Sequence, residues 1–301
     1  MTTVLRWYRP LTVFTAAMAV LTVVAAIGVL ADPRVLTGGP IWIKPLKFAV
    51  SFVLYGTTLA WMLSLLPRRS RVAEWAATVI VAVSVIEMVI IVTQVIRGQA
   101  SHFNATTPLN TALFSIMGNA IMVLFLAQAV IAVVLARQRL GDRVSTTAVR
   151  LGLGLSLLGM LAAIPMVLPS AAPDRPGISG AHSVGVLDGG PGLPLVGWST
   201  VGGDLRIGHF VGLHALQALP LLALLLGTRL TEGVRVGLLR VAGGAYAVLV
   251  MMLTWQALRG QPLLRPDPLT LAAWSVLLVA TAASAAVVVA RGHRPELELA
   301  A

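Results

Sequence analysis

Cysteine is absent from the 301 residues, so this sequence cannot form a disulfide, a thiolate metal site or a cysteine-bound iron–sulfur cluster. Charged residues are also scarce, at 11%, whereas hydrophobic residues make up 57% and the mean hydropathy is +0.90. A soluble domain of this size would not keep so apolar a surface in water. These shortages indicate an integral membrane protein whose main partner is the lipid bilayer.

The apolar residues form eight runs, each long enough to cross a hydrocarbon core that takes roughly 20 helical residues. Lipid offers no partner to an open backbone, and the runs are too long and too uniformly apolar for barrel strands. We therefore predict an all-α membrane protein with eight transmembrane helices. The predicted spans are Leu11–Ala31, Leu46–Leu66, Trp75–Ile96, Leu109–Ala136, Ala148–Leu168, Ile207–Gly227, Val236–Leu258 and Leu269–Ala290.

Arginine placement orients the chain. Arginines cluster after every second span and at both chain ends, so the clusters share one face of the membrane and predict cytoplasmic termini. The net charge of +11 is then a topology signal, and nucleic acid is not an expected partner. The clusters are Arg6 and Arg9, Arg68 to Arg71, Arg137 to Arg143, Arg229 and Arg235, and Arg291 and Arg294.

A short motif occurs twice, each time at the end of an apolar run. Residues 94–99 read Gln-Val-Ile-Arg-Gly-Gln, residues 256–261 read Gln-Ala-Leu-Arg-Gly-Gln, and each is followed by Pro-Leu and a new apolar run. The equivalent positions predict a duplicated four-helix unit, with halves 1–144 and 145–301 in parallel orientation. We also expect Asp204 and Asp267 to cap the helices that follow them.

Ionisable residues inside membrane helices are costly and tend to mark function. Glu87 lies ten residues before Arg97, at a depth similar to that of His214 below Arg206, so the two side chains could form a hydrogen bond. Because each occurs once in the two halves, we expect a single pocket between the halves. The pocket candidates are Glu87, Gln94, Arg97, His102, Asn104, Arg206, His209, His214 and Gln217, with His102, His209 and His214 as candidate metal ligands.

The loop between the fifth and sixth runs, residues 170–205, is long and nearly uncharged but contains apolar residues. A loop of this length usually has a function. We predict a folded lid over the outer end of the bundle, and a flexible glycine-rich connector is the alternative. The lid candidates are His182, Asp188, Trp198 and Asp204.

Lysine is almost absent as well: the chain has 20 arginines but only Lys44 and Lys47, at the outer end of the second run. A compact ammonium group suits an anionic ligand, and a long apolar stem also lets lysine reach lipid headgroups. Both interpretations stay open.

Three strings of the sequence resemble a bacterial family of polytopic membrane proteins: residues 41–48, residues 97–104 and residues 203–217. The resemblance implies a multi-pass protein of the bacterial cytoplasmic membrane, and no activity. The architecture is also similar to that of haem A synthases, which have two four-helix halves. That family places histidines on helix pairs in each half, whereas the second, fourth and eighth runs here contain none, so its haem sites are not carried over.

Three classes of function remain from the sequence. The first is a redox protein that binds haem or a metal ion through histidines. The second is a proton-coupled transporter in which Glu87 titrates, and the third is a scaffold or assembly protein with a small-molecule or protein partner on the outer face. No nucleotide-binding loop, nucleophile elbow or zinc-protease motif occurs, so the sequence leaves open whether the protein is an enzyme.

Overall fold

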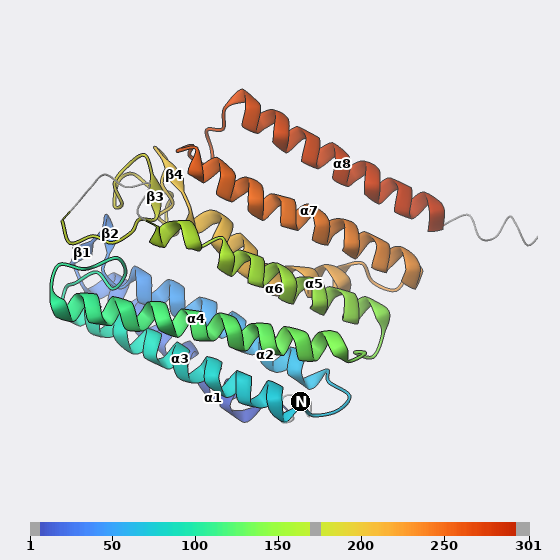
Figure 1. Ribbon diagram of the computed structural model, residues 1–301, viewed down its shortest axis with the longest axis horizontal. Helices are drawn as coiled ribbons and strands as arrows, with labels where there is room; N and C mark the ends of the chain where they lie inside the picture. Colours follow the sequence, from blue (N-terminus) through green and yellow to red (C-terminus); the bar gives the residue numbers. More distant parts are fainter. Residues whose placement is uncertain (1–6, 169–175, 293–301) are drawn as a thin grey trace, which may run out of the picture.

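The computed structural model describes residues 7–168 and 176–292. It confirms the all-α membrane fold: eight helices are long and apolar enough to span a membrane (Figure 1). These are α1 Arg9–Ala31, α2 Ile43–Ser64, α3 Arg71–Ile96, α4 Pro108–Arg137, α5 Arg143–Leu161, α6 Arg206–Leu225, α7 Glu232–Leu258 and α8 Pro268–Gly292.

Four two-residue strands gather at one end of the bundle, which we call the strand end. The opposite end, which carries the arginine-rich connections, is the arginine end. β1 (Val35–Leu36) pairs antiparallel with β2 (Gly39–Pro40), and β3 (Ser183–Val184) pairs with β4 (Gly203–Asp204). After α5, the chain continues into the 3₁₀ helix η2 (Ile164–Val167), so the fifth apolar run is a shorter α-helix than predicted.

Local sequence signals set most helix starts. Proline occupies the first position of α4 and of α8, where its missing N–H costs nothing. Asp267 accepts a hydrogen bond from the Thr270 N–H at 2.8 Å, which confirms the predicted cap of α8. Asp204 accepts from the Arg206 N–H at 3.1 Å, although the residue directly before α6 is Leu205.

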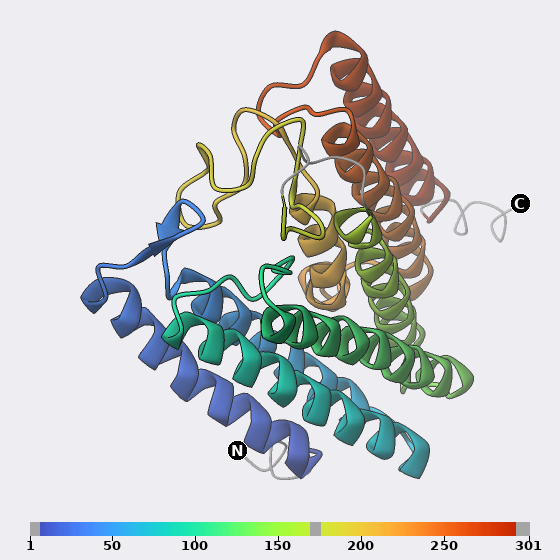
Figure 2. The same ribbon diagram turned by 60° about the vertical axis from the view of Figure 1, so that its left-hand side comes forward.

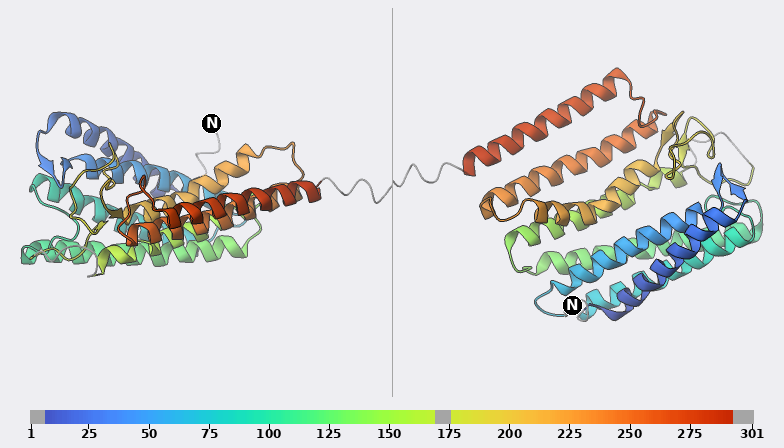
Figure 3. Two further views of the ribbon diagram at one scale, coloured as in Figure 1. Left: turned by 90° about the horizontal axis from the view of Figure 1, so that it is seen from above. Right: turned by 180° about the vertical axis from the view of Figure 1, so that it is seen from behind.

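The first four helices and the last four form two adjacent groups (Figures 1 and 2). Within the groups, α1 packs on α2, α3 on α4, α5 on α6 and α7 on α8, and between the groups α4 contacts α5 and α2 contacts α6. Figure 3 shows α8 at the edge of the molecule beside α7, and Thr270 is the one described α8 residue that is buried. The junction between the groups is therefore formed by α2, α4, α5 and α6.

The two glutamine–arginine motifs end their helices in the same way. The side-chain amide of Gln94 donates to the Ala100 carbonyl at 3.2 Å, and that of Gln256 donates to the Pro262 carbonyl at 2.8 Å. Each acceptor lies six residues after its glutamine. The glutamines thus tie each loop to the helix that precedes it.

The arginines of the two motifs also have equivalent partners. Arg97 Nη1 donates to Asn110 Oδ1 at 3.1 Å, and Arg259 Nη1 donates to Thr270 Oγ1 at 2.8 Å. Asn110 and Thr270 are each the third residue of the next helix. Each motif thus joins two successive helices through side-chain hydrogen bonds. That residues 1–144 superpose on residues 145–301 stays a prediction.

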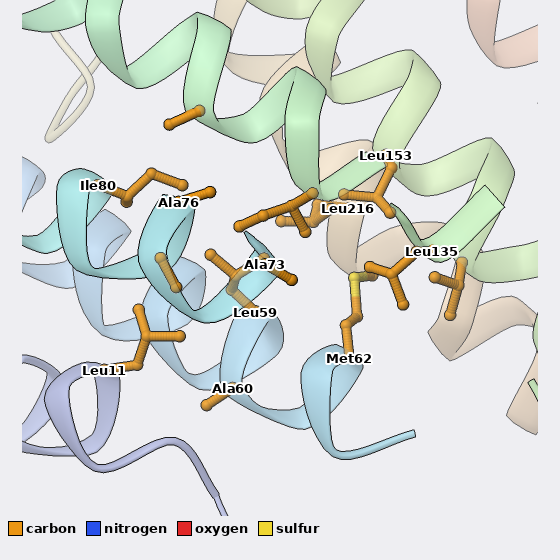
Figure 4. Close-up of a cluster of buried hydrophobic side chains, with 14 of the residues drawn as sticks. Leu11, Leu59, Ala60, Met62, Ala73, Ala76, Ile80, Leu135, Leu153 and Leu216 are labelled. Atoms are coloured by element: carbon orange, nitrogen blue, oxygen red, sulfur yellow. The ribbon is translucent and has the colours of Figure 1, made fainter. Parts of the chain in front are cut away.

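A cluster of apolar side chains fills the junction towards the arginine end (Figure 4). Leu59 and Met62 of α2 meet Leu135 of α4, Leu153 of α5 and Leu216 of α6, and none of the five is more than 1% exposed. We call these five residues the apolar plug. Because it draws on both groups of helices, it closes the space between them at that end.

Helices α5 and α6 approach each other through glycine. A Cβ atom on Gly159 would overlap the backbone of Gly212 on α6, whereas one on Gly154, also on α5, would meet nothing within 4 Å. Membrane helices commonly use such small residues where backbones pack closely.

We predict that Gly159→Ala destabilises the protein, by about 1–3 kcal/mol, because the added methyl group must push α5 away from α6. The measurement is thermal or denaturant unfolding of the purified protein in detergent. Gly154→Ala is the matched control and should be neutral or slightly stabilising, since alanine favours helix over glycine. Equal effects of the two substitutions would contradict the close approach.

Candidate functional site

Glu87 is the most unusual polar residue of the described chain. It lies on α3, and its side chain is 1% exposed. Neither carboxyl oxygen has a hydrogen-bond partner, and the nearest basic atom is Nε2 of His102, at 3.6 Å from Oε1. Buried polar groups in folded proteins nearly always have partners, so a carboxyl group left without one requires an explanation.

His102 reaches Glu87 from the loop between α3 and α4. Its imidazole packs against three phenylalanine rings, with centroid distances of 5.8 Å to Phe48, 6.2 Å to Phe103 and 6.3 Å to Phe114. Its Nδ1 lies 3.1 Å from the Ser101 hydroxyl. The imidazole side chain is 21% exposed, so solvent reaches this residue although it does not reach Glu87.

The charge state of His102 follows from its surroundings. Burial lowers the pKa of His102 well below its usual value of 6.5, and the Lys44 cation lowers it further. At neutral pH the imidazole is therefore uncharged. Its contact with Glu87 is then not an ion pair, and the carboxyl group gains no opposite charge from it.

Lys44 brings a positive charge to the same region. It lies half-buried in the first turn of α2, one turn before Phe48, whose ring packs against the imidazole of His102. Lys47, one turn further along, instead donates a hydrogen bond to the Val196 carbonyl at 3.0 Å. Lys47 therefore holds the long loop, and Lys44 lies on the same face of α2 as the Phe48 contact with His102.

The long loop contributes a histidine–aspartate pair. His182 Nδ1 lies 2.7 Å from Asp188 Oδ2, and because a carboxylate only accepts, Nδ1 carries the proton. The backbone N–H of Ser183 donates to the same carboxylate at 2.8 Å. Burial alone would raise the pKa of Asp188, but the hydrogen bond from His182 holds that pKa well below its usual range. Burial also lowers the pKa of His182, so this imidazole is neutral at neutral pH, with Nε2 unprotonated.

Phe103 connects the two histidines. Its ring centroid lies 6.2 Å from that of His102 and 4.8 Å from that of His182, edge-on to both. The residue adopts φ = 58°, a left-handed conformation that is strained for an aromatic residue. This backbone conformation directs the Phe103 ring, which is 6% exposed, towards both histidines. The ring therefore forms the contact between the first half and the long loop.

The described part of the loop, from residue 176 onwards, folds across the first half (Figure 2). Asn104 forms a β-bridge with Ile178, and the backbones of Gly38 and Gly189 are in contact. Trp198 is half-buried, whereas Leu195 is 81% exposed. The loop is thus folded, as the lid hypothesis expects, although not all of its apolar residues are covered. Residues 170–175 of the predicted lid lie outside the described residues.

Asp204 and Arg206 neutralise each other within the loop. Arg206 Nε donates to Asp204 Oδ1 at 2.9 Å, and Asp204 Oδ2 also accepts from the Ser199 N–H at 2.8 Å. The Arg206 guanidinium extends further to the Gly197 carbonyl. These two sequence candidates therefore organise the loop and the start of α6.

The two histidines of α6 form contacts other than the expected one. His209 Nδ1 bonds the Gly159 carbonyl of α5 at 2.8 Å, and His214 Nδ1 lies 3.3 Å from Gln217 Oε1. Gln217 also donates to Thr58 Oγ1 of α2, at 3.1 Å, and so joins the two halves. The expected Glu87–His214 hydrogen bond was wrong, because the loop after α3 folds back and places His102 beside the carboxyl group.

Gln94, Arg97 and Asn104 lie near the strand end but bond other groups. Gln94 and Arg97 both bond Asn110, at 3.1 Å each, and the Asn104 amide donates to the Ala100 carbonyl at 3.1 Å. They shape the loop that carries His102 rather than contacting Glu87 directly.

No metal centre is formed by the described residues, since no three histidine, aspartate or glutamate side chains are grouped so that they could hold an ion. The proposed ligand set of His102, His209 and His214 is thus not assembled. His209 and His214 face different partners on α5 and α6, as described above.

The aromatic residues around His102 were not predicted from the sequence. Phe48 lies one residue beyond Lys47, and Phe103 directly follows His102. These neighbours were a usable signal for an aromatic site, but aromatic residues in membrane helices usually face lipid or core.

Fold and site together define the chain as a multi-pass membrane protein with a buried acidic group near one end. Comparison with protein-family models, with curated proteins and with solved structures found no match.

We predict that Glu87→Met raises the melting temperature, because it removes a buried carboxyl group whose missing hydrogen bonds cost about 1–3 kcal/mol. Glu74→Met on the same helix is the control: Glu74 pairs with Arg69 at 3.0 Å near the start of α3, so its loss should lower stability slightly. The two substitutions are compared by thermal unfolding in the same detergent. A lower melting temperature for Glu87→Met would identify the carboxyl group as a structural element.

We further predict a loss of stability on mild acidification. Because the pKa values of His102 and His182 are lowered in the folded protein, the unfolded chain binds more protons just below pH 6.5. Their contribution to stability is complete above about pH 6.5 and is lost as the pH falls. Melting temperatures between pH 7.5 and 5.5 should therefore decline, and His102→Gln should decline less steeply than the wild type. Identical slopes would show that the pKa of His102 is the same in the folded and the unfolded chain, which would contradict the lowered pKa.

Proposed function

We propose that the protein binds a small ligand from the outer side of a bacterial cytoplasmic membrane. The arginine end is assigned to the cytoplasm by the positive-inside rule, which puts the strand end and the long loop outside. The observation that carries the proposal is the Glu87 carboxyl group, buried and without a hydrogen-bond partner beside His102. A ligand supplies the missing partner.

The exposure of the side chains supports entry of a ligand from the strand end. His102 is 21% exposed, whereas the apolar plug at the arginine end is almost completely buried. A ligand therefore enters from the strand end, passes the imidazole and meets Glu87 behind it. The His182–Asp188 pair on the long loop lies over this route as part of a lid.

The arrangement also suits a site built once in a duplicated unit. The first half supplies Lys44, Glu87 and His102, and the loop of the second half supplies His182 and Asp188. Such a junction is where two-half membrane proteins commonly bind their ligands.

Proton-coupled transport is the second candidate, because polar contacts continue between the halves beyond the site. Tyr55 of α2 donates to Gln128 of α4 at 2.9 Å, and Gln128 donates to Ser156 of α5 at 2.6 Å. Transport differs from binding alone in that the apolar plug must open during the cycle.

A haem or metal cofactor fits these residues poorly. The Phe103 ring packs against both His102 and His182, so one haem could not bind both imidazoles unless Phe103 moved. An absorbance spectrum with metal analysis of the purified protein tests this directly.

The natural absence of cysteine makes the proposed access testable. We predict that His102→Cys reacts with a membrane-impermeant thiol reagent added to spheroplasts, as does Leu195→Cys on the exposed loop. Arg69→Cys, with an 82% exposed side chain at the arginine end, should react only after permeabilisation. Met62→Cys in the plug, at 0% exposure, should stay unlabelled in both conditions.

Labelling of Leu195→Cys without labelling of His102→Cys would contradict an outer-facing site. Labelling of Arg69→Cys in intact spheroplasts, with protection of Leu195→Cys, would reverse the assigned orientation.

A further inference from the structure

Most charged side chains around the site already have a direct partner among the described residues. The loop aspartates bond a neighbouring cation or imidazole, and the outer lysine bonds a backbone carbonyl. These contacts are Asp204 with Arg206, Asp188 with His182, and Lys47 with Val196.

Glu87 and Lys44 are different. Phe48, one helical turn after Lys44 on α2, packs against the imidazole of His102, which lies beside Glu87 of α3. Among the described residues, no ion pair joins Lys44 to Glu87, and the neighbour of Glu87 is the neutral His102. Glu87 accepts no hydrogen bond, and no hydrogen bond from Lys44 is formed within the described chain. An amine and a carboxyl group therefore lie in the same part of the bundle without bonding each other, which is costly unless something bridges them.

The surroundings of His102, beside Glu87, are aromatic. Phe48, Phe103 and Phe114 pack around the imidazole that contacts Glu87. Aromatic faces attract ammonium groups, and the attraction grows when water is excluded. The acidic side of the site thus favours an organic cation over a hydrated metal ion, consistent with the lack of a three-ligand group among the described residues.

We propose that the site binds a small zwitterion, with its ammonium group at Glu87 among the phenylalanine rings and its phosphate or carboxylate at Lys44. This inference rests on the proposed function and names the ligand class of the same site. A free solute and the ethanolamine headgroup of a phospholipid share this chemistry. Both reach the strand end, one from solution and one from the outer leaflet.

The test uses the full chain in phosphatidylglycerol nanodiscs, which contain no zwitterionic lipid. Binding of phosphoethanolamine is measured by calorimetry and compared with ethanolamine, which carries only the ammonium, and methyl phosphate, which carries only the anion. We expect phosphoethanolamine to bind at least about 10-fold more tightly than either half, because it makes two charge-assisted contacts.

Two substitutions test the ammonium end and the anionic end of the ligand separately. Glu87→Gln should weaken phosphoethanolamine and ethanolamine by about 10- to 100-fold and leave methyl phosphate unchanged. Lys44→Met should weaken phosphoethanolamine and methyl phosphate and leave ethanolamine unchanged. Arg34→Gln is the control, since this strand-end arginine is engaged with Asp32. Melting curves check that each variant folds, and if one does not, the other still tests its own end of the ligand.

Nanodiscs that contain phosphatidylethanolamine distinguish the two sources. A lower apparent affinity for phosphoethanolamine there means that the lipid headgroup occupies the site, and an unchanged affinity means that the ligand is a free solute. Equal affinities for phosphoethanolamine and ethanolamine, or no effect of both substitutions, would overturn the zwitterion proposal. If His102→Cys is labelled from outside while none of the three probes binds, the ligand class is wrong and the outer-facing site stands.

Discussion

A lipid bilayer offers no water to polar groups, and every other feature of this structure follows from how the chain meets that constraint. The glutamine–arginine motifs satisfy loop carbonyls and the next helix, and Gln128 and Gln217 each bond a side chain across the junction of the two halves. Glu87 is the carboxyl group that the described chain leaves without a partner. Trp7, Thr15, Ser84 and Arg235 also bury a side-chain atom without a partner, but none of these is a carboxyl group. We therefore place the proposed site at Glu87.

Glu87 lies in a region where the two halves of the chain differ. They share the glutamine–arginine motif, with the same contacts to the next helix, but the α6 and α7 helices carry no counterpart of the Glu87 carboxyl group. The second half instead provides the long loop, which reaches Lys47 and Asn104 of the first half. The proposed site lies at the junction of these unequal halves, and the apolar plug closes the other end of that junction.

The sequence predicted what depends on composition and local spacing. The eight spans, the prolines at the first positions of α4 and α8 and the Asp267 cap all follow from short-range patterns, and the structure confirms them. Depth along a helix also marked Glu87 as an inward-facing acid. The residue beside Glu87 could not be predicted that way. His102 reaches Glu87 from a loop whose path depends on the left-handed conformation of Phe103.

Lys44 shows the same limit. Its place at a helix end suits a headgroup contact as well as an inward one, and the two are distinguished by how α2 packs beside α3 and the loop that carries His102, not by the spacing along α2. The sequence placed His209 and His214 in one pocket with Arg206, yet the close contact between α5 and α6 gives His209 a carbonyl partner on α5. Contacts between helices, rather than the pattern along one helix, determine which polar groups meet.

The most direct measurement is an electron cryo-microscopy map of the protein in phosphatidylglycerol nanodiscs with phosphoethanolamine present. The account predicts density that bridges the Lys44 ammonium and the Glu87 carboxyl group, next to His102 and beneath the long loop. A map in which Lys44 and Glu87 bond each other directly, or in which Glu87 faces lipid, would contradict it.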